Sequence, residues 1–409
     1  MTTLKITLAL LLATTWMSAK ADDAPLIARG EYLARAADCV ACHTTQGGKP
    51  FTGGLAFKLP FGTLYSPNIT PDKATGIGSW SDDDFVNAVQ KGGGKGGQHY
   101  YPAFPYTSYG LMPREDILAI KAYLFSLKPV NQPPKENQIG FPFNQRWGMF
   151  FWNLAFTPSK TFQPDPEKSA QWNRGAYLVQ GPGHCGECHT PRNLAQAMST
   201  SNSLAGAKIG NWIAYNISSD KKYGVGGWPQ DVLKHYLSTG EAPGYAMAGG
   251  PMTDVIENSL KYLTPEDIHA IAVYLQDSPP RHEGIARPTP ETMATNFAQS
   301  DGNELGRKLF LDSCASCHRI DGQGNQSPVA TLKGLKTVND PAGTNLLAVV
   351  LAGHDPAIFG SEHTMPGFAQ NYNNEEMAAL STFVLHHFGQ SGGVIKPKDV
   401  QESRDGALH

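Results

Sequence analysis

Cysteines are scarce in this sequence, and so are long apolar runs. Only six of the 409 residues are cysteine. We expect no disulfide framework, because such frameworks are typical of short chains that cannot bury a sufficient core. Past the first residues, no segment approaches the roughly 18 consecutive apolar residues of a membrane-spanning helix. The formal net charge of −3 lacks the basic excess typical of nucleic-acid binding or of polybasic lipid contacts. Convincing alternation of apolar and polar residues is also missing, so we expect a mainly α fold.

The apolar stretch at the start of the chain has the pattern of a secretory signal peptide. Lys5 precedes an apolar core at 6–16, and Ala19-Lys20-Ala21 matches a cleavage site with small residues at its outer positions. The apolar core is too short to span a bilayer. We therefore expect residues 1–21 to be removed and the mature chain to begin near Asp22.

All six cysteines lie in three copies of one motif, Cys-x-x-Cys-His, which reads DCVACH at 38–43, HCGECH at 184–189 and SCASCH at 313–318. Three isolated pairs do not divide evenly into four-ligand zinc sites. A thioredoxin-like redox pair would sit near a βαβ pattern and needs no following histidine. The motif is instead the attachment signature of a c-type haem. On one helical turn both thiols reach the two vinyl groups of the porphyrin, and the histidine binds the iron.

The motif therefore predicts three covalently bound haems c, each held by two thioethers and one proximal histidine. The expected ligands are Cys39, Cys42 and His43 in the first copy, Cys185, Cys188 and His189 in the second, and Cys314, Cys317 and His318 in the third.

The sixth iron ligand decides between electron transfer and chemistry on a bound molecule. A methionine thioether stabilises reduced iron, and we expect one shortly before the helix that closes each repeat. Met112 and Met365 have this position, and the second repeat offers both Met247 and Met252. Histidine is the competing ligand type, with His99, His235, His354 and His363 as the nearest contenders.

Each haem motif lies between two predicted amphipathic helices, so a domain-sized unit repeats along the chain. The helical segments before the motifs are RGEYLARAADC, RGAYLVQGPGHC and LGRKLFLDSC, and those after them are MPREDILAIKAYLFSL, LTPEDIHAIAVYLQDSP and NNEEMAALSTFVLHHFG. Proline-rich connectors are suited to semi-rigid, extended spacers. We expect a signal peptide at 1–21, domains at 22–130, 165–280 and 300–391, linkers at 131–164 and 281–299, and a polar, mobile tail at 392–409.

An aromatic segment, RWGMFFWNLAF at 146–156, lies inside the first predicted linker. One interpretation is that it folds onto the neighbouring domains. The other is that part of it stays exposed as a docking surface for a partner subunit.

This organisation resembles class I cytochromes c, in which the helix before the motif crosses the closing helix. The resemblance implies three tandem class I cytochrome c domains. Gly30 and Gly175 would allow the crossing helices to approach closely, with Tyr32, Tyr177, Tyr123 and Tyr274 filling the crossings.

Over most of its length the chain is similar to the trihaem cytochrome c subunit of membrane-bound bacterial dehydrogenases. That family includes the cytochrome subunits of FAD-dependent gluconate, fructose, sorbitol and glucose dehydrogenases and of quinoprotein alcohol dehydrogenase. The stretches that carry the similarity are RGEYLARAADCVACHT, YSPNITPDKATGIGSWSDDDF, YYPAFPYTSY, NRGAYLVQGPGHCGECHTPRN, GPMTDVIENSLKYLTPEDIHAIAVYL and TMPGF.

The similarity implies that Met112, Met252 and Met365 are the sixth ligands, which favours Met252 over Met247. It also implies a flavin- or quinone-bearing catalytic subunit as partner, a small subunit, and ubiquinone as the electron acceptor. The complex would lie in the periplasm at the outer face of the inner membrane. Several relatives carry a C-terminal membrane tether that this chain lacks, so we expect its attachment to depend on partners. Alternative functions are a free periplasmic multihaem carrier and a haem peroxidase.

Overall fold

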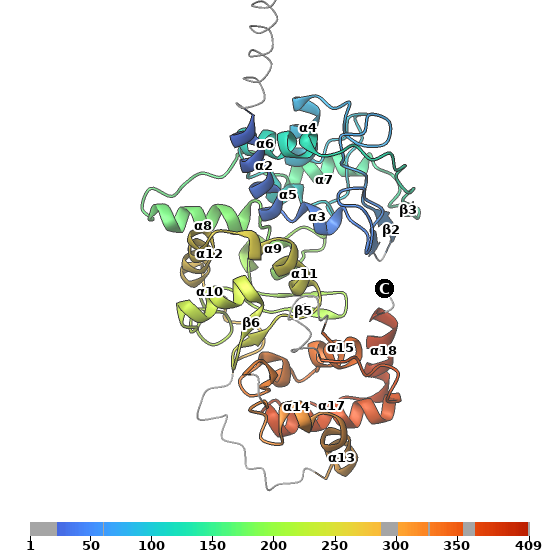
Figure 1. Cartoon of the computed structure of the whole chain (residues 1–409), viewed down its shortest axis with the longest axis vertical. Coiled ribbons are helices and arrows are strands. Elements are labelled where there is room, and N and C mark those ends of the chain that lie inside the picture. Colours follow the sequence, from blue (N-terminus) through green and yellow to red (C-terminus); the bar gives the residue numbers. More distant parts are fainter. Residues whose placement is uncertain (1–22, 60, 288–301, 326–327, 355–364, 408–409) are drawn as a thin grey trace, which may run out of the picture. The chain divides into compact units, whose positions relative to one another are not determined.

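The computed structural model describes residues 23–59, 61–287, 302–325, 328–354 and 365–407. The protein is mainly helical, as predicted, and its strands are confined to short antiparallel pairings (Figure 1). The predicted signal peptide at 1–21 lies outside the described residues, as does most of the second predicted linker. Within the described ranges, no helix combines the length and apolar character needed to cross a membrane.

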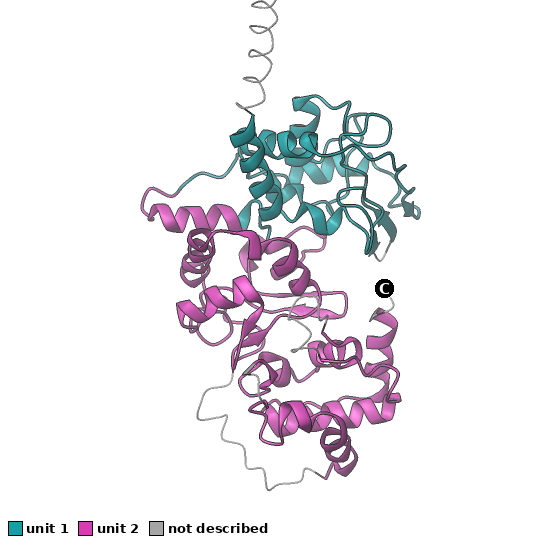
Figure 2. Cartoon of the chain, in the orientation of Figure 1, with its two compact units in different colours: residues 1–164, 180–184 teal, residues 165–179, 185–409 magenta. Residues whose placement is uncertain are grey.

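The chain divides into two compact units, of which the first comprises residues 1–164 and 180–184 (Figure 2). A small antiparallel sheet in the order β1-β2-β3 accompanies its helices. The elements are α2 (Ala24–Ala36), α3 (Cys39–Cys42), β1 (Ala56–Leu59), β2 (Gly62–Tyr65), α4 (Asp82–Lys91), α5 (Tyr106–Tyr109), α6 (Arg114–Ser126), β3 (Gln138–Ile139) and α7 (Gly148–Phe156).

The second unit comprises residues 165–179 and 185–409. Its helices are α8 (Ala170–Gln180, whose last residue falls in the first unit), α9 (Gly186–His189), α10 (Gln230–Thr239), α11 (Pro251–Asn258), α12 (Pro265–Asp277), α13 (Glu304–Ser313), α14 (Ala315–His318), α15 (Thr344–Ala352), α17 (Asn374–Phe388) and α18 (Pro397–Ala407). Short 3-10 turns lie at η1 (Thr200–Asn202), η2 (Leu260–Tyr262), η4 (Pro328–Ala330) and η5 (Lys336–Asn339), and hairpins at β4 (Ala207–Ile209) with β5 (Trp212–Ala214) and β6 (Glu241–Ala242) with β7 (Ala246–Met247).

The second and third predicted domains lie within one compact unit. The side chain of Asn345, on α15, joins them by pairing with the backbone of Ile213 on β5. It accepts a hydrogen bond of 2.7 Å from the Ile213 amide and donates one of 3.0 Å to the Ile213 carbonyl. Asn211 adds a bond of 2.7 Å to the carbonyl of Ser403. The periodicity of apolar residues predicts individual helices. It does not predict a hydrogen bond between a side chain such as Asn345 and the backbone of a distant residue.

Each repeat contains a close crossing between the helix before its haem motif and its closing helix. A Cβ atom at Gly30 would lie 1.8 Å from the carbonyl oxygen of Ala119, and one at Gly175 would lie 1.9 Å from that of Ala270. Only glycine fits such backbone contacts. The third repeat has the same arrangement, with Gly306 against Ala379. The predicted close approach is confirmed for Gly30 and Gly175.

The closing helices begin at capping residues that the sequence displays. The Thr264 hydroxyl accepts a bond of 3.2 Å from the Asp267 amide, and Pro265 is the first residue of α12. At α17, Asn373 and Glu376 exchange side-chain-to-backbone bonds of 2.9 Å in a capping box. These caps fix where the helices start.

The C-terminal segment is folded, so the prediction of a mobile tail is wrong for residues 397–407. These residues form α18, which packs against α15 and α17. Val400 is fully buried in the same core as Met377 and Leu385. The segment is polar along most of its length, and a single apolar side chain at one helical face was too weak a signal to predict docking.

The first predicted linker is also folded. Its residues 138–139 form β3, which pairs with β2, and residues 148–156 form α7. The linker therefore belongs to the first compact unit instead of acting as an extended spacer.

Candidate haem-binding sites

The three Cys-x-x-Cys-His motifs lie on short helices directly after α2, α8 and α13. The helices are α3, α9 and α14, and a single turn of each carries its motif. None of the six cysteines forms a disulfide bond; Cys317 is exposed and the other five are half-buried. Thiols three residues apart on one helical turn lie on the same face, which is the arrangement required for two thioether bonds to one porphyrin.

Burial keeps the first thiol of each pair protonated. It raises the pKa of Cys39 and of Cys185 to about 12 and that of Cys314 to about 11, with the neighbouring cysteine adding to the effect. Reactive redox cysteines and zinc ligands need a stabilised thiolate, which requires a lowered thiol pKa instead of a raised one. No group of three or more His, Cys, Asp or Glu residues suited to a metal ion occurs in the described part of the chain. The environment therefore favours haem attachment over zinc or thiol redox chemistry.

Each motif histidine is held by one backbone carbonyl through its Nδ1 atom. The distances are 2.8 Å from His43 to Pro67, 2.6 Å from His189 to Tyr215 and 2.7 Å from His318 to Ala330. A carbonyl can only accept, so Nδ1 carries the proton and Nε2 keeps its lone pair for a metal. Burial lowers the pKa of all three imidazoles, which keeps them neutral.

In the first repeat, one asparagine beside the histidine-holding carbonyl fixes the start of the connector. Asn68 follows Pro67, and its Nδ2 donates 2.8 Å and 3.3 Å bonds to the carbonyls of Val130 and Gln132. The Thr70 hydroxyl accepts a bond of 3.2 Å from the Val130 amide. The connector is thereby bound to its own domain.

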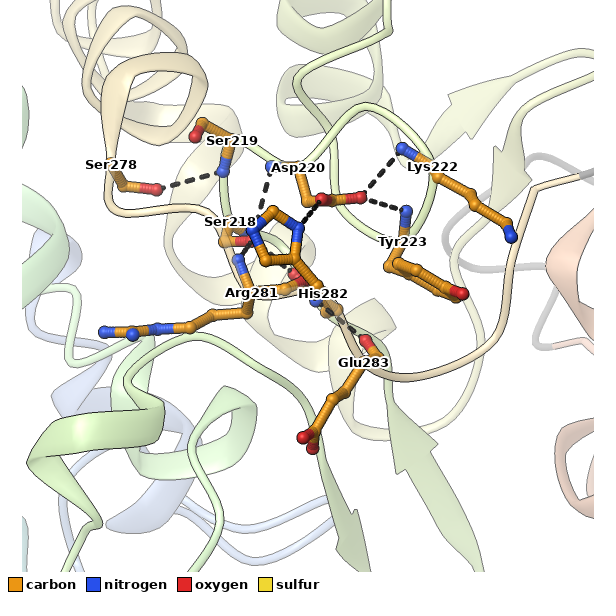
Figure 3. A network of polar contacts seen from close by, with 10 residues as sticks. Ser218, Ser219, Asp220, Lys222, Tyr223, Ser278, Arg281, His282 and Glu283 are labelled. Atoms are coloured by element: carbon orange, nitrogen blue, oxygen red, sulfur yellow. Dashed lines mark hydrogen bonds and ion pairs between the residues drawn. The ribbon is translucent and has the colours of Figure 1, made fainter.

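The second repeat uses the same device. Asn216 follows Tyr215 and donates bonds of 2.7 Å and 2.9 Å to the carbonyls of Arg281 and Glu283. The adjoining turn is held by Asp220, which accepts from the backbone amide of Tyr223 and from His282 Nδ1, both at 2.6 Å (Figure 3). The two asparagines lie in the similar stretches SPNIT (66–70) and AYNIS (214–218). The similar spacing of these stretches after the haem motifs is the signal in the sequence that could have identified them.

The methionines predicted as sixth ligands lie at the edges of the helical cores. Met112 is fully buried just before α6, and its carbonyl accepts a bond of 2.8 Å from Gln90. Met252 is the second residue of α11 and Met247 lies on β7, and both are half-buried. Met365 is half-buried against the core formed by α13, α15 and α17. The assignment of these methionines to iron stays a prediction.

The structure places His354 beside Met365. The His354 amide donates a bond of 2.9 Å to the Met365 carbonyl. Burial lowers the pKa of the His354 imidazole, and the charge of His318 lowers it further.

The other competing histidines differ in their placement. His99 Nδ1 lies 3.2 Å from Nδ2 of Asn153, within the contact that holds α7. His235 is exposed on α10. His363 lies outside the described residues.

A buried polar atom in the second repeat supports the fit of a haem. Trp228 is 8% exposed, packs between Tyr236 and Tyr245, and has no hydrogen-bond partner for its indole Nε1 among the described residues. A buried N–H without an acceptor is costly. A haem propionate oxygen is an acceptor that an indole N–H can use. The cysteine pairs, the oriented imidazoles and this donor together fit a c-type haem.

Helix α7 exposes an aromatic face and buries a polar residue. Asn153 is buried, accepts a bond of 2.7 Å from the Tyr106 hydroxyl and donates one of 3.0 Å to the Lys91 carbonyl. The segment around α7 also has large exposed side chains, which we name the aromatic patch: Phe141, Phe143, Trp147, Phe150, Phe151 and Leu154, between 52% and 82% exposed. The expectation that part of the segment stays exposed agrees with this arrangement.

Comparison with known proteins gives one consistent result. The cytochrome c family model matches residues 27–128 and 303–388. The gluconate 2-dehydrogenase cytochrome c subunit of Pantoea cypripedii is 40% identical, covering 98% of this chain and 95% of that protein. The cytochrome c subunit of the quinone alcohol dehydrogenase of Gluconacetobacter polyoxogenes is 37% identical, covering 97% and 88%. The fructose dehydrogenase cytochrome subunit of Gluconobacter japonicus is 37% identical, covering 93% and 83%.

Proposed function

Because this chain belongs to the family of cytochrome c subunits of dehydrogenases, we propose that it is the electron-transfer subunit of a dehydrogenase complex and carries three covalent haems c. The observation that carries the proposal is the threefold repetition of a cysteine pair outside any disulfide, followed by a histidine whose Nδ1 is held by a carbonyl. A c-type haem supplies a one-electron couple between ferric and ferrous iron.

The protein's part is to hold each haem and to close both faces of its iron. The cysteine pairs would form the thioethers, and His43, His189 and His318 would bind iron through Nε2. Met112, Met252 and Met365 would take the sixth positions. A thioether there favours the reduced state and leaves no open position for peroxide, so conduction is favoured over a peroxidase activity.

The electron donor in this proposal is a flavin- or quinone-bearing catalytic subunit, accompanied by a small subunit. The relatives are named for gluconate, alcohol and fructose dehydrogenases. Such different substrates beside one type of cytochrome chain support a substrate site in the partner subunit. Ubiquinone is the proposed final acceptor, which places the complex in the periplasm at the outer face of the inner membrane.

The aromatic patch is the surface we propose for docking of the catalytic subunit. Between 137 and 164 the chain contains no acidic residue, and Arg146 and Lys160 are its only charges. Depletion of charge and enrichment in Phe and Trp are typical of the core of a protein interface.

Purification of the tagged chain from membranes of its native host tests the proposal. We expect a flavin- or quinone-bearing subunit to co-purify, the haem absorption of the complex to become reduced on addition of that subunit's substrate, and ubiquinone to be reduced in turn. A haem-loaded chain that always purifies alone would indicate a free carrier. Carbon monoxide binding to the reduced protein would indicate an open iron and contradict sixth-ligand methionines.

A further inference from the structure

Lys336, the first residue of η5, is a buried cation between the second and third repeats. This residue is only 6% exposed. The ammonium group donates a hydrogen bond to the carbonyl oxygen of Tyr223 and lies 5.8 Å from the centre of the Tyr215 ring. No carboxylate forms an ion pair with Lys336 within the described ranges. A buried charge without an opposite partner is costly to keep.

The acceptor of this ammonium group is held rigidly. Tyr223 ends a turn in which its own amide donates a bond of 2.6 Å to Asp220, as does His282 from the connector (Figure 3). Asn345 fixes the two repeats against one another through both polar atoms of the Ile213 backbone. The position of the charge relative to the second repeat is therefore set by the fold.

Tyr215 contacts both this charge and the proximal imidazole of the second repeat. The ring of Tyr215 faces the Lys336 ammonium group, and its carbonyl accepts the 2.6 Å bond from His189 Nδ1. Burial lowers the pKa of His189, and the positive charge of Lys336 lowers it further. A residue of the third repeat thus reaches the proximal side of the second haem site.

The ammonium form predominates at neutral pH, although burial and the charge of Arg287 lower the pKa of Lys336 to about 8. Arg287 adds a second cation in this region, with its guanidinium 3.5 Å from the centre of the Tyr245 ring. The negative charge of Asp220 raises the pKa of Lys336, which opposes these effects, and the Asp220 carboxylate is already bonded to His282.

We propose that the ammonium group of Lys336 raises the reduction potential of the haem held by Cys185, Cys188 and His189. Ferric haem carries one more positive charge than ferrous haem, so a fixed cation in a medium of low dielectric constant destabilises the oxidised state. Lys336 is thus a positioning residue that acts through the electrostatic field at His189. This inference rests on the proposed function, since it requires a haem at that motif.

The test is a spectroelectrochemical redox titration of the full-length, haem-loaded protein. Lys336→Met removes the charge at similar volume, and Lys336→Arg keeps it. Lys221→Met is the matched control, because it removes the same charge from an exposed position in the turn that provides Tyr223.

The wave of the second haem is the one lost in the Cys185→Ala/Cys188→Ala variant. If that variant does not accumulate, this wave is the one that both Met112→Ala and Met365→Ala leave unshifted.

We expect Lys336→Met to shift that single wave to lower potential, Lys336→Arg to restore it, and Lys221→Met to leave all three unchanged. Haem content measures the proposed function separately: a wild-type chain without three haems refutes that function, whatever Lys336 does. Unchanged potentials in a fully loaded Lys336→Met variant, a shift to higher potential, or a shift of a different wave would each overturn the inference. Should Lys336→Met not accumulate, Lys336→Gln must give a lower potential than Lys336→Arg.

Discussion

Gly175 on α8 lies so close to the carbonyl oxygen of Ala270 on α12 that a Cβ atom would be 1.9 Å away. The bidentate ion pair of Arg174 with Asp267, at 2.8 and 2.7 Å, holds the same crossing from the neighbouring position. Helix α8 leads directly into the second haem motif. The crossing therefore helps to position Cys185 and His189.

Gly175→Ala should destabilise the protein by about 1–3 kcal/mol, because the methyl group meets backbone that cannot move aside. Denaturant unfolding of the haem-loaded chain measures the change. Gly148→Ala is the matched control, since nothing lies within 4 Å of a Cβ atom at that position, and its effect should stay within about 0.5 kcal/mol. Equal stability of the two variants would show that the crossing tolerates a side chain.

Replacing each proposed sulfur ligand with alanine should lower the potential of one haem and leave haem content at three. The residues to replace are Met112, Met252 and Met365, since loss of the thioether removes the ligand that favours reduced iron. Redox titration and loss of the sulfur-to-iron charge-transfer band measure the effect. Met247→Ala and His354→Ala are the controls and should leave every potential unchanged. A lowered potential in Met247→Ala but not in Met252→Ala would identify Met247 as the ligand. A lowered potential in His354→Ala but not in Met365→Ala would identify His354.

Replacing Cys314 or Cys317 with alanine should impair haem attachment in the third repeat alone. Each thioether depends on one thiol of its own motif, and the motif sits on its own short helix, α14. Intact-mass measurement and haem quantification should show a chain with two stably attached haems. Loss of all haem from a folded chain would mean that the three sites do not load independently.

Replacing Phe150 and Phe151 together with serine should abolish co-purification of the catalytic subunit and leave the cytochrome chain folded. These side chains are 52% and 61% exposed, so their removal costs little internal packing and much of the proposed contact area. Haem content and thermal unfolding verify that the chain itself is unchanged. Leu194→Ser, at another fully exposed apolar residue, is the matched control and should assemble normally. Normal assembly of the double variant would exclude the aromatic patch as the docking surface.

Asp220→Asn should reduce stability near neutral pH and have a smaller effect in acid. Although burial opposes the shift, hydrogen bonds from Tyr223, His282 and Lys222 lower the pKa of the Asp220 carboxyl below 3.8. A folded-state pKa below the unfolded value gives stability that is present above about pH 4 and lost as the pH falls through the folded pKa. The difference in Tm between wild type and variant should therefore shrink below about pH 4. Asp231→Asn, on exposed α10 surface, should show no such dependence, and a constant Tm difference for Asp220→Asn would contradict the charge argument.

Much of the haem-site chemistry was readable because it is local. Cys39, Cys42 and His43 are neighbours in sequence, so one helical turn is enough to place them. The caps at Thr264 and Asn373 are equally local, because each bonds to a backbone amide three residues further along the chain. The docking of α18 was missed because a single apolar side chain in a polar segment shows no periodicity. The first linker was predicted as an extended spacer because of its prolines, although part of it folds as β3 and α7.

The sequence by itself determined the motifs, the helix pairs and the family of this chain, because each depends on residue types at fixed short spacings. Only the tertiary structure decided which carbonyls hold His43 and His189, how Asn345 joins two repeats, and that Lys336 is buried beside Tyr215. These contacts join residues far apart along the chain, and the packing of whole helices selects their partners. No short-range pattern specifies such contacts.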